Sequence, residues 1–332
     1  MVTSAKRDTY MNADVGTTIP ENDILAYYVW IPRYKYKLFN ATYASGKASQ
    51  LIEVIFENGT STTGNVTCTY ASNGKETCQK KANGNLYTHP AFTMKNASGN
   101  KTELKGIWVG KFETTGSTTT PTIKPGITSL RSITVANMYN TGKLFRSTDY
   151  ITSNGINQSD SHMMKNIEWG AVAYLKQSIY GLGITDITIN NNSSYYTGGG
   201  TGTSYKKNKG QSTSGNITGV YDMSGGAAEY VMGNYNKTAG YSGLNVSGIP
   251  AEHIDIYSED NVFASHLGDA TGETAGWYDD YVYFVSSDGH HWFERGGHNE
   301  NGDSAGVFEF YGNTGEDYSY YGFRVVLSAT GA

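Results

Sequence analysis

The sequence is poor in charged residues and has no long apolar run. Both features limit the kinds of fold that the chain can adopt. Only 17% of its 332 residues are charged, whereas 27 are tyrosine and 41 are glycine. This composition favours strands and long loops over a bundle of helices. No run of 18 or more apolar residues occurs, so we expect no membrane-spanning helix. Met1–Ser4 carry no hydrophobic signal core.

Basic residues are almost missing from the C-terminal part of the chain. Between His266 and Tyr321 there are eleven aspartates or glutamates and one basic residue, Arg295. An acidic face repels phosphate backbones, so nucleic acid is not the expected partner. A ligand with a basic face suits this segment, and its binding is expected to weaken as the salt concentration rises.

Cys68 and Cys78 are the only cysteines. They flank Asn73-Gly74, a pair typical of a two-residue hairpin turn. Strands leaving that turn would bring the sulfurs into bonding range, which makes the two cysteines a disulfide candidate and implies an oxidising compartment. Two free thiols in a cytosolic protein are the alternative.

Apolar spacing predicts one long helix at Met163–Ile179, capped by Asp160 or Ser161 and ended by Gly181. A shorter helix is expected within residues 129–142. Strands are expected at residues 26–38, 51–57, 106–113, 282–285 and 322–327, and Pro32 indicates a sheet edge or a bulge.

The chain is expected to form a single domain over residues 26–332, preceded by a flexible segment at 1–25. Two insertions are expected in it. One is the hairpin region at 58–100, and the other is a mobile loop rich in glycine and serine at 190–216. Lys206 and Lys207 follow the glycines of this loop, but no Gly-Lys-Ser/Thr follows, so it is not a phosphate-binding loop.

Near the C-terminus, apolar and glycine positions alternate with polar and tyrosine positions. The first set indicates a scaffold and includes Trp292, Arg295, Gly296, Gly297, Phe323 and Arg324. Both arginines are expected to form buried ion pairs or to bond to backbone carbonyls.

The second set resembles a binding surface, because tyrosine beside Ser, Gly, Asp and Asn is the composition of antibody paratopes. We expect these residues, with Tyr281, to be exposed and to contact a ligand. The candidate ligand-binding residues are Tyr278, Asp279, Asp288, His290, His291, Glu294, His298, Asn299, Glu300, Asp303, Glu309, Tyr311, Asn313, Glu316, Asp317, Tyr318, Tyr320 and Tyr321.

Four motifs occur in order along the chain: Glu168-Trp169, Tyr221–Val231, Arg295-Gly296-Gly297 and Gly322-Phe323-Arg324. Together they resemble the formylglycine-generating-enzyme (sulfatase-modifying factor) branch of the C-type lectin fold. Tyr221–Val231 resembles that branch's Leu-Tyr-Asp-Met-Ser-Gly-Asn-Val-Trp-Glu-Trp segment. The others are Glu168-Trp169 in the predicted helix, the Arg-Gly-Gly turn at 295–297 and the Gly-Phe-Arg strand at 322–324. The resemblance implies an α+β, C-type-lectin-like fold with mixed antiparallel sheets, two helices and long loops.

Enzymes of that branch use a late pair of cysteines to bind copper and activate oxygen. No cysteine follows Cys78 here, so we expect no enzyme activity and no cofactor. The chain more closely resembles variable proteins of diversity-generating retroelements, found in phages and bacteria, in which asparagine codons are mutated at adenine to give Tyr, Asp, His, Ser, Gly or Thr. The residues between the scaffold positions in this C-terminal part of the chain are drawn largely from that list, although the four glutamates at 294, 300, 309 and 316 would need a lysine codon.

Two groups of residues have side chains that could bind a metal ion. His290, Glu294 and His298 are spaced four residues apart, but Gly296-Gly297 breaks any helix there, so no metal is expected. Asp222 and Glu229 are expected to be structural, with a structural calcium as the alternative.

We therefore expect a ligand-binding display protein that is extracellular, on a cell surface or on a phage particle, and that binds a protein or cell-surface ligand. The alternatives are a carbohydrate-binding lectin or adhesin and, with less support, an oxidase of the formylglycine-generating type.

Overall fold

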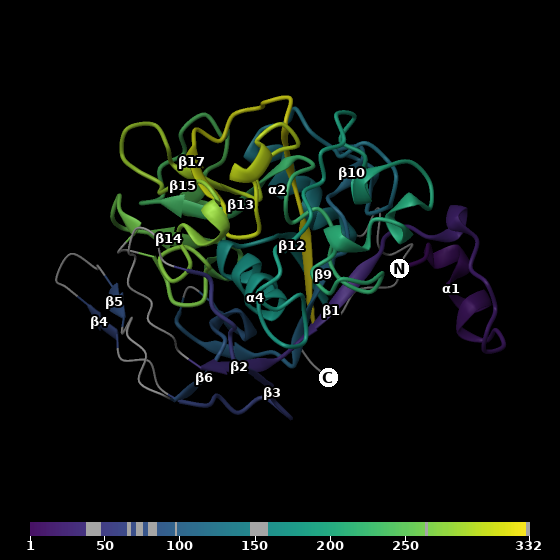
Figure 1. The fold of residues 1–332 in the computed structure, drawn as a ribbon, viewed down its shortest axis with the longest axis horizontal. Helices are drawn as coiled ribbons and strands as arrows, with labels where there is room; N and C mark the ends of the chain where they lie inside the picture. Colours follow the sequence, from purple (N-terminus) through teal and green to yellow (C-terminus); the bar gives the residue numbers. More distant parts are fainter. Residues whose placement is uncertain are drawn as a thin grey trace.

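The computed structural model describes residues 1–37, 48–64, 68–70, 76–78, 85–96, 98–146, 159–262 and 265–329. The fold is mixed α+β, with several antiparallel sheets and few helices (Figure 1). No helix among these residues is long and apolar enough to cross a membrane.

One sheet joins the early part of the chain to its end. It has four antiparallel strands in the order β1 (Tyr28–Pro32), β9 (Gly106–Gly110), β19 (Val325–Ala329) and β12 (Ser159–Met163). β1 is an edge strand, which confirms the edge position predicted from Pro32, and it ends at that proline. The predicted strand at 26–38 is interrupted at Arg33, after which β2 (Tyr34–Lys37) enters another sheet.

A second sheet carries most of the C-terminal segment. Its order is β14 (Asp255–Tyr257), β13 (Ala228–Tyr235), β16 (Trp292–Arg295), β17 (Phe310–Asn313) and β15 (Val282–Tyr283), and β18 (Tyr321–Phe323) also pairs with β13. β13 and β16 are antiparallel, as are β16 and β17, whereas β14, β15 and β18 pair in parallel. The predicted strand at 322–327 is therefore two strands in different sheets, and the one at 282–285 is shorter than predicted.

The remaining strands form small sheets. β2 lies between β3 (Val54–Phe56) and β6 (Leu86–Thr88). The two-stranded pairs are β10 (Thr115–Gly116) with β11 (Pro121–Thr122), β7 (Thr93–Lys95) with β8 (Lys101–Glu103), and β4 (Cys68–Tyr70) with β5 (Glu76–Cys78).

β4 and β5 confirm the antiparallel pairing predicted around the cysteines, because Cys68 and Cys78 are directly opposite in register. Their side chains and the Asn73-Gly74 turn lie outside the described residues, so the disulfide stays a prediction.

The long helix is α4 (Asn166–Lys176), which is shorter than predicted. Met163 belongs to β12, and the predicted caps Asp160 and Ser161 lie in that strand, so that prediction is wrong. The Glu168 carboxylate instead accepts a hydrogen bond of 2.9 Å from the Lys165 backbone N–H and so closes the first turn. α4 is buried on nearly every side, which explains why it lacks a polar face.

Two other helices are α1 (Ser4–Met11) and α2 (Val135–Gly142). The Thr134 side chain accepts from the Asn137 N–H and caps α2 within the predicted range. The described residues also form short 3-10 turns: η1 (Glu21–Asp23), η2 (Pro90–Phe92), η3 (Lys143–Arg146), η4 (Thr197–Gly199), η5 (Ser204–Lys206), η6 (Lys209–Gln211), η7 (Val246–Gly248), η8 (Ala251–His253), η10 (Trp277–Asp279) and η11 (Gly302–Ser304).

The polar composition of residues 1–25 did not predict α1, which projects at the right of Figure 1. The segment is tied to the body where the Met1 amino group donates to the Ala26 carbonyl at 2.7 Å. The region at 58–100 is more than an inserted hairpin, because β6 pairs with β2, and Phe92 lies in the core. Residues 190–216 lack strands but are packed, and Tyr205 and Ser212 in them are buried.

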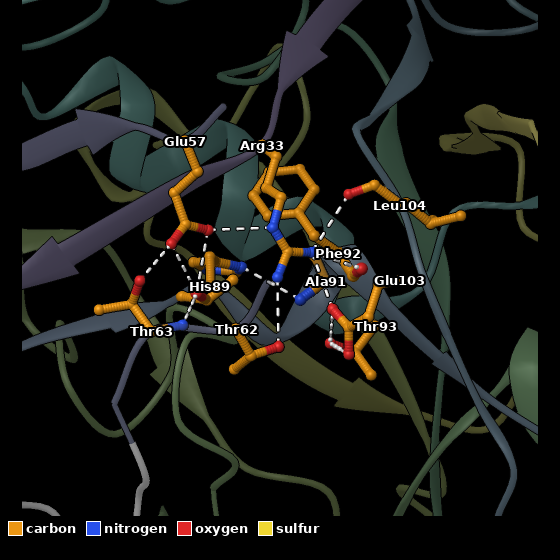
Figure 2. A network of polar contacts seen from close by, with 11 residues as sticks. Arg33, Glu57, Thr62, Thr63, His89, Ala91, Phe92, Thr93, Glu103 and Leu104 are labelled. Carbon is orange, nitrogen blue, oxygen red and sulfur yellow. Dashed lines mark hydrogen bonds and ion pairs between the residues drawn. The ribbon is translucent and has the colours of Figure 1, made fainter. Parts of the chain in front are cut away.

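A buried arginine organises the sheet around β2 (Figure 2). The Arg33 side chain is fully buried, and its guanidinium donates to the carboxylates of Glu57 at 3.0 Å and Glu103 at 2.8 Å. It also donates to the carbonyls of Phe92 and Leu104. Because protein acceptors surround this guanidinium, we interpret the network as structural.

Candidate functional site

The site is built on the three central strands of the six-stranded sheet. One row of residues crosses these strands in register, and it consists of Tyr230 of β13, Glu294 of β16 and Tyr311 of β17. Successive residues of a strand point to opposite faces, so Glu294 and Arg295 face different sides of the sheet.

Arg295 lies behind the row and holds neighbouring segments together. Its guanidinium is fully buried and donates to the carbonyls of Glu309, Asp269 and Ala270 and to the side chain of Asn166, at 2.7–3.0 Å. This confirms the bonding to backbone carbonyls that the sequence predicts.

The turn after β16 needs glycine. Gly296 and Gly297 have φ values of 85° and 64°, and a Cβ on Gly297 would lie 2.9 Å from the Cα of Ala305. The Gly297 N–H donates to the Glu309 carboxylate at 3.0 Å. This turn therefore leads the chain from the end of β16 to His298 and holds Glu309 in place.

An open cavity of about 470 Å³ lies at this row. Seven of its ten lining residues belong to the candidate set predicted from sequence, although they come from separate stretches of the chain. The lining consists of Tyr281, Glu294, His298, Glu300, Asn301, Ser304, Glu309, Tyr311, Tyr320 and Tyr321.

Two carboxyl groups lie buried in the wall of the cavity. Glu294 is 7% exposed, and one of its carboxylate oxygens has no hydrogen-bond partner among the described residues. Burial raises the pKa of Glu294 to about 8, and the hydrogen bond from the Tyr321 hydroxyl offsets part of that rise. Burial, and then the charge of Glu294, hold the pKa of Glu309 well above its ordinary value.

Aromatic rings form much of the remaining wall. The Tyr320 ring lies 4.7 Å from His298 and 4.6 Å from Tyr321, measured between centroids. Tyr281 and Tyr311 are a second pair, 5.9 Å apart. These contacts hold the rings in place, so the cavity is preformed rather than assembled by a ligand.

The candidate residues are not all on the surface. Six are exposed: Asp279, Asp288, Glu300, Asp303, Asp317 and Tyr318. Six are half-buried: Tyr278, His290, His298, Tyr311, Glu316 and Tyr320. The other six are buried: His291, Glu294, Asn299, Glu309, Asn313 and Tyr321.

The expectation of exposure is therefore wrong for the six buried residues. The sequence does not show whether the polar group of a side chain forms a hydrogen bond inside the folded protein. Here several of the buried candidate residues do so. Asn313 donates to the Tyr321 hydroxyl, and a His291 ring nitrogen lies 2.9 Å from the Ser286 carbonyl. Three of the buried residues, Glu294, Glu309 and Tyr321, nevertheless line the cavity.

Tyr278 packs against neighbouring side chains and is not one of the residues found to line the cavity. Its ring stacks on Phe308, the Lys176 ammonium lies 4.6 Å from its centroid, and its hydroxyl bonds to Gln177 at 2.8 Å.

The sequence did not predict two residues that line the cavity, Asn301 and Ser304. Their position between the scaffold landmarks Gly297 and Ala305 is the signal that could have identified them.

The scaffold residues Trp292, Arg295, Gly296, Gly297, Phe323 and Arg324 are all buried. Arg324 donates to the Glu229 carboxylate at 3.1 Å and to the carbonyls of Gly110 and Tyr221, a second arginine bonded as predicted. Burial raises the pKa of Glu229 to about 7, and Arg324 opposes that rise.

Asp222 also has protein partners. It accepts from the Gly198 N–H and the Asn190 side chain at 2.9 Å each, which anchors the 190–216 segment. Burial raises its pKa to about 6. These contacts agree with the structural role expected for Asp222 and Glu229.

The residues that the structure describes contain one group with the spacing of a metal site, namely Asp160, His162 and His253. Its atoms already bond to one another, because one Asp160 oxygen lies 2.6 Å from His162 and 3.0 Å from His253. The other His162 nitrogen lies 3.0 Å from Glu168. Sequence reasoning missed this group because His253 is distant along the chain.

The sequence matches no protein family model and no curated protein.

Proposed function

We propose that the chain is a ligand-binding display protein with a C-type-lectin-like fold, and that residues 277–321 form its recognition surface for a protein or cell-surface ligand. One observation carries the proposal: seven residues selected from sequence as ligand contacts line a single open cavity. Residues that merely filled loops would have no reason to converge on one cavity.

The C-type-lectin-like fold has support of its own. The Tyr221–Val231 motif leads into β13, at the centre of the six-stranded sheet. The arginines of the Arg-Gly-Gly and Gly-Phe-Arg motifs both lie buried among carbonyl acceptors. β9 also pairs with β19, so an early strand and the final strand share a sheet.

We further propose that this surface was diversified by a retroelement, and that the protein works outside the cell, on a cell surface or on a phage particle. Residues such as Glu300 and Asp317 are exposed, and substitutions at exposed positions usually change stability little. The DNA test is a nearby reverse transcriptase with a near-copy of the codons for residues 277–321 that differs only at adenines. Differences spread over all four bases would exclude this history.

A display library tests the binding function. Positions 298, 300, 311, 318 and 320, all exposed or half-buried, are randomised and selected against purified lysozyme, cytochrome c and albumin. We expect folded clones that each bind one target, with more binders to the two basic proteins and binding that weakens with salt.

A matched library randomises the buried positions 292, 295, 297, 323 and 324 and is expected to unfold. If the first library unfolds as often as the second, or yields no binder above the unselected pool, the display function is refuted.

A carbohydrate-binding lectin is the second candidate, because tyrosine faces and carboxylates in one cavity also suit sugars. Calcium-dependent binding to a glycan array, abolished by chelation, would favour it over protein recognition. The oxidase alternative would require copper binding or turnover of a cysteine-containing peptide, and the candidate segment contains no cysteine.

A further inference from the structure

A glutamate in the wall of the cavity has a buried carboxylate oxygen with no hydrogen-bond partner among the described residues. Glu294 is more than nine-tenths buried, lines the cavity and has one oxygen without a partner among the described residues. An unpaired buried acceptor costs free energy, so a donor arriving in the cavity gains by pairing with it. A cationic donor gains most, since charge-assisted hydrogen bonds are about twice as strong as neutral ones.

The cavity wall has the charge and the ring chemistry that such a donor requires. Among the described part of the chain, three glutamates and no lysine or arginine line it. The nearest basic group along the chain, Arg295, is fully buried and bonded to carbonyls behind the sheet row. Four tyrosines and a histidine surround the acids, and tyrosine faces attract ammonium and guanidinium groups electrostatically.

We infer that this cavity binds a cationic group, an alkylammonium or a guanidinium, which pairs with Glu294 between the rings of Tyr311 and Tyr320. A volume of about 470 Å³ lies within the range of ligand pockets and accommodates a lysine-sized or arginine-sized group. This inference rests on the proposed binding function and names the ligand chemistry of that same site.

Binding is coupled to protons through the groups that face Glu294. Those groups are Tyr230 and Tyr311 from the neighbouring strands, Tyr321, Glu309, and His298 and Glu300 at the cavity. The tyrosines stay neutral, because burial raises the pKa of each of the three. A bound cation stabilises the charged form of Glu294, so binding releases a proton and strengthens as pH rises towards 8.

The experiment titrates the full-length protein with n-butylammonium, n-butylguanidinium and the neutral 1-pentanol, and reads binding from the ligand NMR signals. We expect both cations to bind more tightly than the alcohol. Glu294→Gln is expected to weaken the cations about tenfold or more, since it removes a charge-assisted bond, and to leave the alcohol unchanged.

The matched control is Asp260→Asn, which removes one negative charge from an exposed residue outside both the cavity lining and the proposed recognition surface. It is expected to change cation affinity by less than about twofold, because exposed charges are screened. Tyr320→Leu tests the aromatic wall and is expected to weaken the cations more than the alcohol. Thermal unfolding of each variant checks that it is folded.

Acetyl-Gly-Lys-Gly-amide distinguishes the source of the cation. Tighter binding of this peptide than of n-butylammonium indicates a protein side chain, and weaker binding indicates a free small amine; either result agrees with the inferred chemistry. Equal affinity of the cations in the wild type and Glu294→Gln, or alcohol binding equal to cation binding, overturns it. If that occurs while the randomised library still yields binders, only the cationic inference fails, whereas a library that unfolds removes the proposed function.

Discussion

Glu294→Gln should change how the protein's stability depends on pH. Burial raises the pKa of this carboxyl from 4.5 to about 8, and each pKa unit corresponds to about 1.4 kcal/mol. A group whose pKa is raised on folding contributes stability below its unfolded value and loses it as pH rises through its folded value. The wild type should therefore lose up to about 5 kcal/mol through Glu294 between about pH 4.5 and 8.

Glutamine has nearly the same shape and cannot ionise, so the variant should escape this loss. Urea unfolding at intervals from pH 5 to pH 9 measures it, with the free energy of unfolding extrapolated to water. The variant should match the wild type within about 1 kcal/mol at pH 5 and be more stable by about 3 kcal/mol or more at pH 9.

Other buried carboxyls, Glu309 among them, also have raised pKa values, so only the difference between the two proteins is informative. Parallel pH profiles for the wild type and the variant would refute the reasoning, because they would mean that Glu294 is ionised in the folded protein at pH 5 without cost. Asp260→Asn serves as the control, and its pH profile should follow that of the wild type.

Three further predictions concern the scaffold. Arg324→Met leaves Glu229 buried without its cation and should cost about 3–5 kcal/mol in urea unfolding, and a double variant with Glu229→Met should recover part of that loss. Burial lowers the pKa of His162, but the neighbouring carboxylates outweigh it and raise this pKa to about 9. Protonated His162 therefore contributes about 3 kcal/mol to the free energy of unfolding below pH 6.5, and this contribution is lost as pH rises through 9. In His162→Gln this part of the dependence of urea unfolding on pH should vanish. Gly170→Ala places a Cβ 1.8 Å from the Gly268 carbonyl, so its melting temperature should fall by several degrees or the protein should not fold, and an unchanged melting temperature would mean that this close packing is absent.

Local pattern predicted the secondary structure where one physical cause dominates. The 3.6-residue spacing identified α4, and the Asn-Gly turn between the cysteines indicated the β4–β5 pairing. Boundaries were less accurate, because the residues before α4 pair with β19 and so belong to a strand. That pairing joins residues far apart in the chain, and a local pattern carries no record of it.

Part of the candidate site was also predictable. The composition of residues 277–321 identified seven of the cavity's lining residues, since tyrosine and acidic side chains among turn glycines are typical of recognition surfaces. Composition did not separate the exposed Tyr318 from the buried Tyr321, because strand pairing and turns decide burial. Nor did it find Asp160, His162 and His253, which only folding brings together.

The sequence by itself determined the acidic character of the C-terminal segment and predicted a chain rich in strands and loops with few helices. Those properties depend on residue type and near-neighbour spacing, which the chain carries before it folds. The tertiary structure alone decided that Glu294 lies in register between Tyr230 and Tyr311, and that one of its oxygens is buried with no partner among the residues that the structure describes. Desolvation in that place changes an ordinary acid into a group with a raised pKa, and residue type alone does not specify its surroundings.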